Sequence, residues 1–433
     1  MEDVEDEPLF AERVAGIDIG KATVMATIRV PGSAGGSRRR QETRQFGTTR
    51  RDLLGLAAWL REWQVERAGM EATSDYWKPV LFTLEREGTE CMLYQASRVK
   101  ALPGRPKTDK LDSAWLARLT ERGSLQGSFI PPEDIRVLRA HTRYRRHLVQ
   151  ARTAEKQRAE KLLEDAHLKL SSVLSDIHGA SGRAMLEAII AGERDPAALA
   201  QLARKRARAK IPQLREALDC AFFTSHHAWL LKMMLARIDQ YTTEISQVTA
   251  QISELCQPWG RQLAQLATIP GVSERAAQDL IAEIGVDMSR FPTPAHLASW
   301  ARQAPGVSES AGHRKNKGAG QGNPYSGGTL GEAAAAAART QTFLGARYRR
   351  LIRHMPKLKA QRAIMRAILV ITWHLLSDPD AVYNDLGHDY YDRRDDDHRK
   401  ARSHARALER LGYKVTIEPL HPGHDGATPP RAS

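Results

Sequence analysis

Strand and helix patterns follow one another in a set order over residues 13 to 123, and this order constrains the fold more than any other feature. Three runs rich in β-branched residues come first, and amphipathic helices then alternate with short strands. The expected strands cover residues 13–19, 22–30, 41–48, 65–70 and 91–94, and the expected helices cover 51–63, 74–88 and 108–123. The order predicts an α/β domain.

Four acidic residues occupy defined places in this order. RNase H-like domains have the same order of elements, with one acidic residue on the first strand and another on the fourth, where this chain has Asp18 and Glu71. Asp109 and Asp112 lie three residues apart at the start of the last helix, so they share a helical face. Carboxylates gathered in one crevice repel one another unless divalent cations neutralise them. The four residues therefore predict a Mg2+ site for phosphodiester chemistry.

Each of these acids also has a simpler explanation. Asp18 could be a turn residue, Glu71 a surface carboxylate, Asp109 a helix N-cap and Asp112 half of an exposed ion pair. Their combined placement, at strand ends and on one helical face, favours the metal site.

The charge balance indicates an anionic partner. Lys and Arg number 65 against 51 Asp and Glu, which gives a formal net charge of +14, and nucleic acid is the commonest partner for such a chain. No stretch of 18 uncharged apolar residues is present, so no membrane association is expected. The three cysteines, Cys91, Cys220 and Cys256, form no close pair, and no signal peptide opens the chain, which favours a reducing cytoplasm.

Long charged helices are expected after residue 131. The patterns predict helices over 133–170 and 212–256, and hence a helical arm. The second carries an apolar seam with spacings of three and four, made of Leu231, Leu235, Ile238, Tyr241, Ile245, Val248, Ile252 and Leu255. Such a seam is typical of a coiled coil, and either a second chain or the other long helix would explain it. The first helix carries a basic run that predicts an anion-binding face or a solvated surface, with Arg136, Arg139, Arg143, Arg145 and Arg146.

Two further segments suit phosphate binding. Residues 267–285 are similar to the second half of a helix-hairpin-helix, where the turn at Gly271 exposes backbone N–H groups, although a plain packing corner is the alternative. A Gly-rich basic loop covers residues 305–325, and a flexible linker is its alternative. The residues from 378 onward are expected to form a charged tail, with disorder over 421–433.

The ordered motifs resemble the insertion-sequence transposases of family 110. The resemblance runs from about residue 13 to 350 and rests on Gly16-Ile-Asp-Ile-Gly-Lys21, Met70-Glu-Ala-Thr73, Lys107-Thr-Asp-Lys-Leu-Asp-Ser-Ala114 and Pro305-Gly-Val-Ser-Glu-Ser-Ala-Gly-His-Arg-Lys315. It implies an acidic tail (1–12), a RuvC-like DEDD nuclease domain (13–130), a coiled-coil arm (131–262), a mainly α-helical, serine-bearing transposase domain (263–377) and a C-terminal tail (378–433).

The resemblance also implies an activity, DNA recombination through a serine–DNA intermediate. Asp18, Glu71, Asp109 and Asp112 would hold Mg2+, and Ser310 would attack DNA, with Ser308 as its close competitor. Phosphate clamps would come from His313, Arg314, Lys315 and Lys317. Expected partners are donor and target DNA, a structured guide RNA that the basic helix would help to bind, and further copies of the chain sharing a site, at the bacterial nucleoid.

One stretch departs from the family pattern. After Gly322-Asn323 the family usually has a Leu-Arg pair, where this chain has Ser326-Gly327, so a cation is missing and added glycines would loosen the next helix. A decayed, non-catalytic nucleic-acid-binding protein is therefore one alternative. A RuvC-like nuclease that activates water and uses Ser310 only structurally is another.

Overall fold

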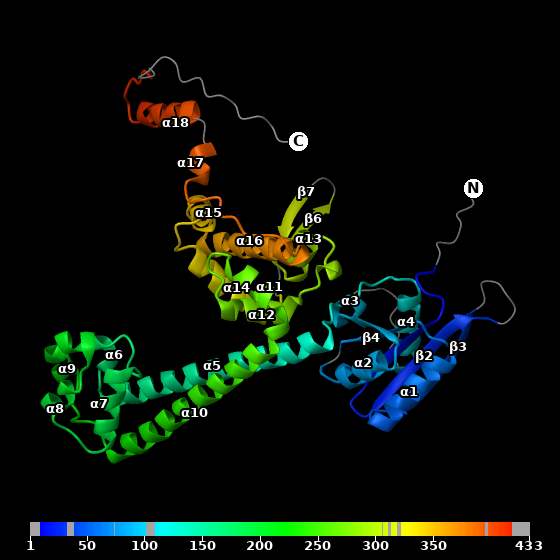
Figure 1. The fold of residues 1–433 in the computed structure, drawn as a ribbon, viewed down its shortest axis with the longest axis horizontal. Helices are drawn as coiled ribbons and strands as arrows, with labels where there is room; N and C mark the ends of the chain where they lie inside the picture. The colour runs from blue at the N-terminus through cyan, green and yellow to red at the C-terminus, as the bar shows by residue number, and fades with distance from the viewer. Residues whose placement is uncertain are drawn as a thin grey trace. The chain divides into compact units, whose positions relative to one another are not determined.

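The computed structural model describes residues 9–32, 39–72, 74–100, 109–304, 306–310, 313–317, 322–394 and 397–417. The chain divides into two compact units, Met1–Ile130 and Pro131–Ser433 (Figure 1). Each unit is described by itself below.

The first unit is built on a five-stranded mixed sheet with the strand order β3-β2-β1-β4-β5. β1 pairs antiparallel with β2 and parallel with β4, and β5 continues the parallel half. The strands are β1 (Val14–Ile19), β2 (Thr23–Pro31), β3 (Arg39–Gly47), β4 (Arg67–Glu71) and β5 (Glu90–Tyr94). This arrangement confirms the RNase H-like order predicted from the sequence.

Helices cover the sheet of the first unit. They are α1 (Arg50–Glu62), α2 (Trp77–Arg86), α3 (Ala96–Lys100) and α4 (Asp109–Glu121), of which the sequence did not predict α3. α1 begins after Thr49, whose hydroxyl accepts a hydrogen bond from the Asp52 backbone N–H. Its buried Leu56 and Leu60 join a core with Ile17 and other apolar side chains of the sheet.

The second unit opens with two long helices, α5 (Glu133–Asp165) and α10 (Ser225–Leu255), which pack along each other (Figure 1). Leu231, Leu235, Ile238 and Ile252 of the expected seam are buried, and its other members are half-buried. The seam of α10 therefore packs against α5 of the same chain, which was one of the two explanations expected from the sequence. A coiled coil between chains stays a prediction.

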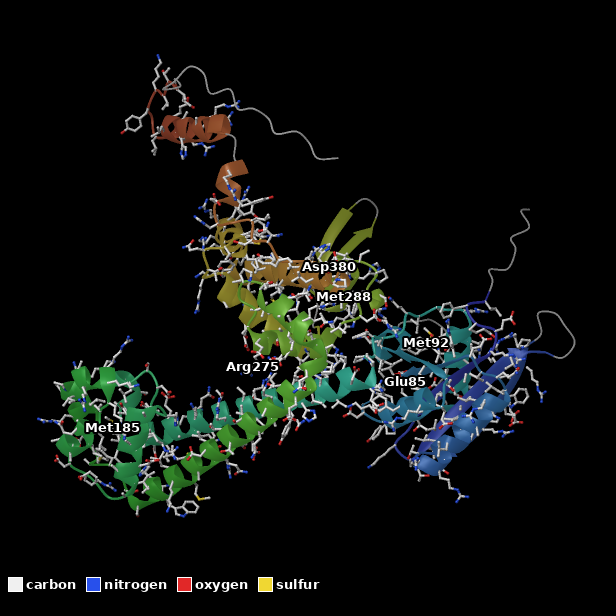
Figure 2. All side chains as sticks on the ribbon, in the orientation of Figure 1. Glu85, Met92, Met185, Arg275, Met288 and Asp380 are labelled. Carbon is white, nitrogen blue, oxygen red and sulfur yellow. The ribbon has the colours of Figure 1, made fainter. Side chains whose placement is uncertain are left out.

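A cluster of short helices joins the two long ones. It contains α6 (Leu170–Val173), α7 (Ala180–Ile190), α8 (Pro196–Gln201), the 3-10 helix η1 (Lys205–Lys210) and α9 (Ile211–Ala217). Met185 lies fully buried within its core (Figure 2). The prediction of one helix over 212–256 was wrong, because Leu218 and Phe223 turn into this core and Thr224 with His227 forms a new helix start.

The rest of the second unit is mainly helical, with one hairpin. Its helices are η2 (Gln257–Trp259), α11 (Gly260–Ala267), α12 (Glu274–Ile284), η3 (Met288–Arg290), α13 (Pro294–Trp300), α14 (Pro324–Ala337), α15 (Phe343–Leu351), α16 (Lys357–Ser377), α17 (Tyr390–Arg394) and α18 (Asp397–Arg410). The hairpin consists of β6 (Gly306–Ser310) and β7 (His313–Lys317). α17 and α18 fall in the segment expected as a tail, and 421–433 lies outside the described residues.

Among the described residues, none of the helices combines the length and apolar character needed to cross a bilayer.

Candidate active site

Asp18 and Glu71 stand at the same end of two neighbouring strands. β1 and β4 run parallel with Ile17 opposite Met70, so the next residue of each strand is an acid. Because side chains alternate between the faces of a sheet, Asp18 shares a face with Gly16, and Glu71 shares it with Gly69. Glu71 is 8% exposed and Asp18 is half-buried. The predicted convergence of these two acids therefore follows from the strand register.

Two glycines let α4 lie directly on this face. A Cβ atom at Gly16 would stand 2.1 Å from the Ala117 backbone nitrogen and the Ser113 carbonyl oxygen. A Cβ atom at Gly69 would stand 2.0 Å from the Thr120 hydroxyl oxygen. A side chain at Gly16 would meet the helix backbone and push the helix off the sheet, whereas one at Gly69 would displace the side chains of Thr120 and Tyr94.

The polar contacts of α4 fix its direction along the sheet. The hydroxyls of Ser113 and Thr27 are 2.7 Å apart, and nearer the helix C-terminus Glu121 forms ion pairs with Arg29 at 3.1 Å and Arg39 at 2.7 Å. Since Arg29 pairs with Val14 and Thr27 with Gly16, the C-terminal end of α4 faces the beginning of β1. The opposite end of α4 opens with Asp109 and Asp112, and it therefore points toward the strand ends that carry the other two acids.

The donor chemistry of this corner suits a hard divalent cation. Asp18, Glu71 and Asp112 supply carboxylate oxygens from β1, β4 and α4, and Mg2+ prefers such ligands. The side chain of Asp109 lies outside the described residues. Among those that are described, no group of three or more His, Cys, Asp or Glu side chains has the geometry to hold a metal ion. The Mg2+ site therefore stays a prediction whose ligand types fit.

The serine candidates lie in the β6–β7 hairpin. Ser310 ends β6 and pairs with His313, the first residue of β7, while Ser308 pairs with Lys315. Arg314 and Lys317 occupy the same second strand. The backbone thus brings two of the predicted phosphate clamps, His313 and Lys315, opposite the serines, and the side chains of the hairpin lie outside the described residues.

The five arginines expected to face nucleic acid all make contacts within the protein. Arg145 is 1% exposed and donates to Gln278 Oε1 at 3.1 Å and to Asp279 Oδ1 at 2.8 Å. Arg139 donates to the backbone oxygen atoms of Ala282, at 2.8 Å, and Glu283. The other three donate to Glu283 (Arg143), to the Tyr325 carbonyl (Arg146) and to the Pro131 carbonyl (Arg136). Whether any of them also binds nucleic acid stays a prediction.

The interface between α5 and α12 shifts the pKa values of its charged groups. Burial, opposed by the charge of Glu283, lowers the pKa of Arg139 to about 10. Burial is the largest single influence on Arg143 and works against its charge, but the hydrogen bonds to Glu283, the charge of Glu283 and Tyr325 together outweigh it and raise the pKa of Arg143. Burial raises the pKa of Asp279 although Arg145 opposes it. Ion pairs with poor access to water therefore hold these two helices together.

Gly271 lies in the turn between α11 and α12. Its contacts fit a plain packing corner, which was the alternative to a phosphate-binding turn. Its φ is +87°, and an added Cβ atom would stand 2.2 Å from the Ala333 carbonyl oxygen on α14. The turn between α11 and α12 therefore packs closely against α14. Phosphate binding by the neighbouring N–H groups stays a prediction.

The stretch that departs from the family pattern forms an intact helix start. α14 begins at Pro324, and the Asn323 side chain caps it by accepting a hydrogen bond from the Tyr325 N–H. The Ser326 hydroxyl is buried and donates to the Asn323 carbonyl oxygen, whereas the space around Gly327 is open. Whether the glycines loosen this helix start stays a prediction.

Two family models match separate parts of the chain. A family model described as "Transposase", of the DEDD type of IS110, matches residues 15–168. A second, described as "Transposase IS116/IS110/IS902 family", matches residues 263–349. None of the curated proteins compared with the chain matches it.

The solved structures similar to this chain include two of RuvC. RuvC from Thermus thermophilus is 15% identical, with a TM-score of 0.22, and the match covers 27% of this chain and 99% of that one. The T. thermophilus RuvC in complex with a Holliday junction substrate is 13% identical, with a TM-score of 0.21 and the same coverage.

The two family matches together span more than half of the chain and contain both Asp18 and Ser310, so the protein is a DNA-processing enzyme of the transposase class. Within that class it belongs to the IS110 family of transposases.

Proposed function

We propose that this transposase cuts and rejoins the DNA of an insertion sequence through a covalent bond between Ser310 and DNA. The observation that supports it best is the register of β1 and β4 beneath α4, since it directs Asp18, Glu71 and the start of α4 to one corner. We further propose that a structured non-coding RNA selects the DNA sites.

Ser310 and the DNA would exchange one phosphodiester bond for another. The Ser310 Oγ–H proton is lost to solvent, the Oγ–P bond forms, the P–O3′ bond breaks and the 3′ oxygen takes up a proton. A 3′-hydroxyl of another strand then reverses these steps at the same phosphorus and releases the serine. Because one ester replaces another, no external energy source is required.

The acidic residues would bind the metal ion, and the basic residues of the hairpin would bind the DNA phosphates. Asp18, Glu71, Asp109 and Asp112 would hold Mg2+, which stabilises negative charge on the phosphate and on the entering and leaving oxygens when it is bound. His313, Arg314, Lys315 and Lys317 would grip the DNA phosphates, since they follow Ser310 directly and pair with its strand.

Serine attack is tested with DNA labelled at its 3′ end and resolved on a denaturing gel. Wild type should give a labelled protein–DNA band, because the serine retains the 5′-phosphate of the labelled fragment. Ser310→Ala should give none, and Ser308→Ala, two residues along the same strand, is the matched control. Full cutting by Ser310→Ala without a covalent band would favour the water-activating nuclease instead.

The acidic site is tested by Asp18→Asn, and by chelation of divalent cations. Both should abolish cutting while nucleic-acid binding persists, because the carboxylates are needed for the reaction and not for affinity. Glu62→Gln, an exposed acid on α1, is the control and should cut normally. Undiminished cutting by Asp18→Asn, or in chelator, would remove the metal proposal.

Sharing of the site between copies of the chain is tested by mixing variants. Asp18→Ala and Ser310→Ala chains are each expected to be inactive alone. If one working site takes carboxylates and serine from different copies, the mixture recovers activity. Continued inactivity of a mixture that does assemble would show that each chain works with its own residues.

A further inference from the structure

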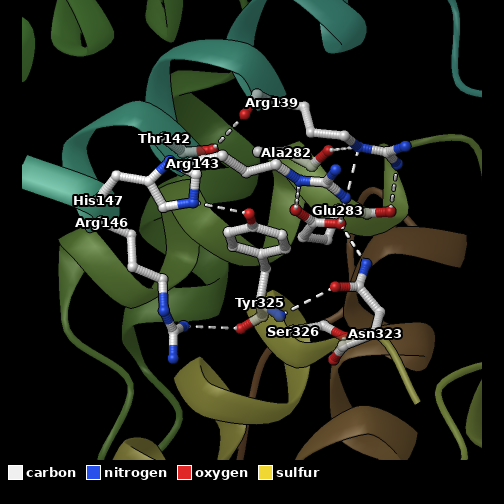
Figure 3. Close-up of polar contacts among 10 residues, drawn as sticks. All are labelled: Arg139, Thr142, Arg143, Arg146, His147, Ala282, Glu283, Asn323, Tyr325 and Ser326. Atoms are coloured by element: carbon white, nitrogen blue, oxygen red, sulfur yellow. Dashed lines mark hydrogen bonds and ion pairs between the residues drawn. The ribbon is translucent and has the colours of Figure 1, made fainter. Parts of the chain in front are cut away.

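A buried carboxylate links three helices of the second unit. Glu283, near the C-terminal end of α12, is 2% exposed. Both of its oxygens accept from Arg143, at 2.8 Å each, and the Asn323 amide also donates to it. Arg139 lies 3.7 Å from the same carboxylate (Figure 3). An acid at this end of a helix opposes the helix dipole, so these donors are needed to hold it there.

Asn323 connects this carboxylate to the exit of the serine-bearing hairpin. Its Oδ1 accepts from the Tyr325 N–H at 2.9 Å and so caps α14, while its amide nitrogen donates to Glu283. Asn323 is six residues beyond the last residue of β7. One side chain thus starts the helix after the hairpin and fastens that start to α12.

The chain enters and leaves the hairpin at the same place. A Cβ atom at Gly322 would stand 2.8 Å from the Ala301 carbonyl oxygen and 3.0 Å from the Arg302 Cβ. Gly322, which follows the hairpin in sequence, therefore lies against Arg302, which precedes it. Because Asn323 comes directly after Gly322, its contacts hold the chain at this place, the base of the hairpin.

Tyr325 attaches this base to the long helix α5. The Arg143 guanidinium lies 4.3 Å from the centre of the Tyr325 ring, and His147 Nε2 is 2.8 Å from the Tyr325 hydroxyl. Arg146 donates to the Tyr325 carbonyl oxygen at 3.1 Å (Figure 3). Arg143 therefore contacts both the buried carboxylate and the first turn of α14.

We propose that Glu283, Arg143 and Asn323 are positioning residues that orient the Ser310 hairpin for attack on DNA. Glu283 acts through Asn323, and none of the three needs to touch the reacting phosphate. This role rests on the proposed function only in taking Ser310 as the nucleophile. The anchoring of the hairpin base is a separate property of the protein and can be measured without DNA.

The sharpest test is Asn323→Asp, which keeps an N-cap oxygen but turns the donor to Glu283 into a second carboxylate. We expect the rate of covalent Ser310–DNA formation at saturating DNA to fall about 10-fold or more, as for loss of a charge-assisted hydrogen bond. DNA affinity should change less than about twofold, because binding residues are untouched. Hydrogen exchange of the amides in residues 306–317 should become faster. Asn384→Asp adds the same charge at an exposed site and is the control.

A second substitution should partly rescue the first. In Asn323→Asp with Glu283→Gln, the amide and the carboxylate have changed places, so the hydrogen bond between the two positions can form again and the net charge is that of wild type. Arg143 then has an amide oxygen in place of its carboxylate partner, so the adduct rate and the hairpin exchange should return part of the way to wild type. Wild-type rate and exchange in Asn323→Asp would overturn the proposal, as would equal losses of affinity, stability and rate without rescue. If wild type forms no adduct, the proposed function fails, and the exchange data alone still decide whether Glu283 anchors the hairpin.

Discussion

The two units position charged side chains by different physical means. In the first, close packing does it: Gly16 and Gly69 leave room for α4, whose first turn points toward the strand ends that carry Asp18 and Glu71. In the second, buried ion pairs do it, with Arg143 on Glu283 and Arg145 on Asp279 joining α5 to α12. Adding a methyl group at a glycine should therefore destabilise the first unit, and removing a buried charge should destabilise the second.

The largest effect is expected in the second unit, from Arg145→Met. The substitution leaves Asp279 and Gln278 without their buried donor, so the free energy of unfolding should fall by about 3–5 kcal/mol. Denaturant unfolding of the purified protein measures this. The control is Arg204→Met, at an exposed position before η1, which should stay within about 0.5 kcal/mol of wild type. Equal changes in the free energy of unfolding for the two substitutions would mean that the buried ion pairs do not stabilise the second unit more than an exposed arginine does.

A smaller effect is expected in the first unit, from Gly16→Ala. The added methyl would meet backbone atoms of Ser113 and Ala117, which cannot rotate away as a side chain can. Unfolding free energy should fall by about 1–3 kcal/mol. Cutting should fall further than nucleic-acid binding, because the displaced helix carries Asp112. Normal cutting by a folded Gly16→Ala protein would contradict the account of how α4 is placed.

The smallest effect, with the opposite sign, is expected from Gly55→Ala. Gly55 is exposed within α1, and no atom lies within 4 Å of the Cβ position. Alanine there should raise the free energy of unfolding by about 0.5–1 kcal/mol, because glycine is a poor helix former. Thermal unfolding detects such a shift. A lower free energy of unfolding for Gly55→Ala would show that glycine substitution destabilises this unit regardless of contacts. It would then weaken the inference that Gly16 is needed for the close approach of α4.

The sequence predicted the order of strands and helices along the first unit, and the RNase H-like order implied the neighbouring places of Asp18 and Glu71. Those features depend on local alternation and on the order of elements, and a single chain displays both. The role of the glycines was missed, because close approach between Gly16 and Ala117 joins residues about a hundred positions apart. Sequence alone cannot rank such distant contacts.

The basic run on α5 shows a second limit. Its charges predicted an anion-binding or solvated face, yet Arg143 and Arg145 bind acids some 130 to 140 positions away on α12. Asp279 and Glu283, four apart on α12, share one face of that helix and were the available signal. A pair of acids on one helix points to a basic partner only when the packing of the two helices is known. Glu283, Asn323 and Tyr325 were missed for the same reason.

The central claim, serine attack on DNA, is tested most directly by locating the bond. Protein–DNA adduct is isolated, the DNA is trimmed with nuclease, and the protein is digested and sequenced by tandem mass spectrometry. The account predicts a nucleotide remnant linked through its 5′-phosphate to Ser310. Cut DNA with an unmodified Ser310, or a remnant on Ser308 or any other residue, would contradict it.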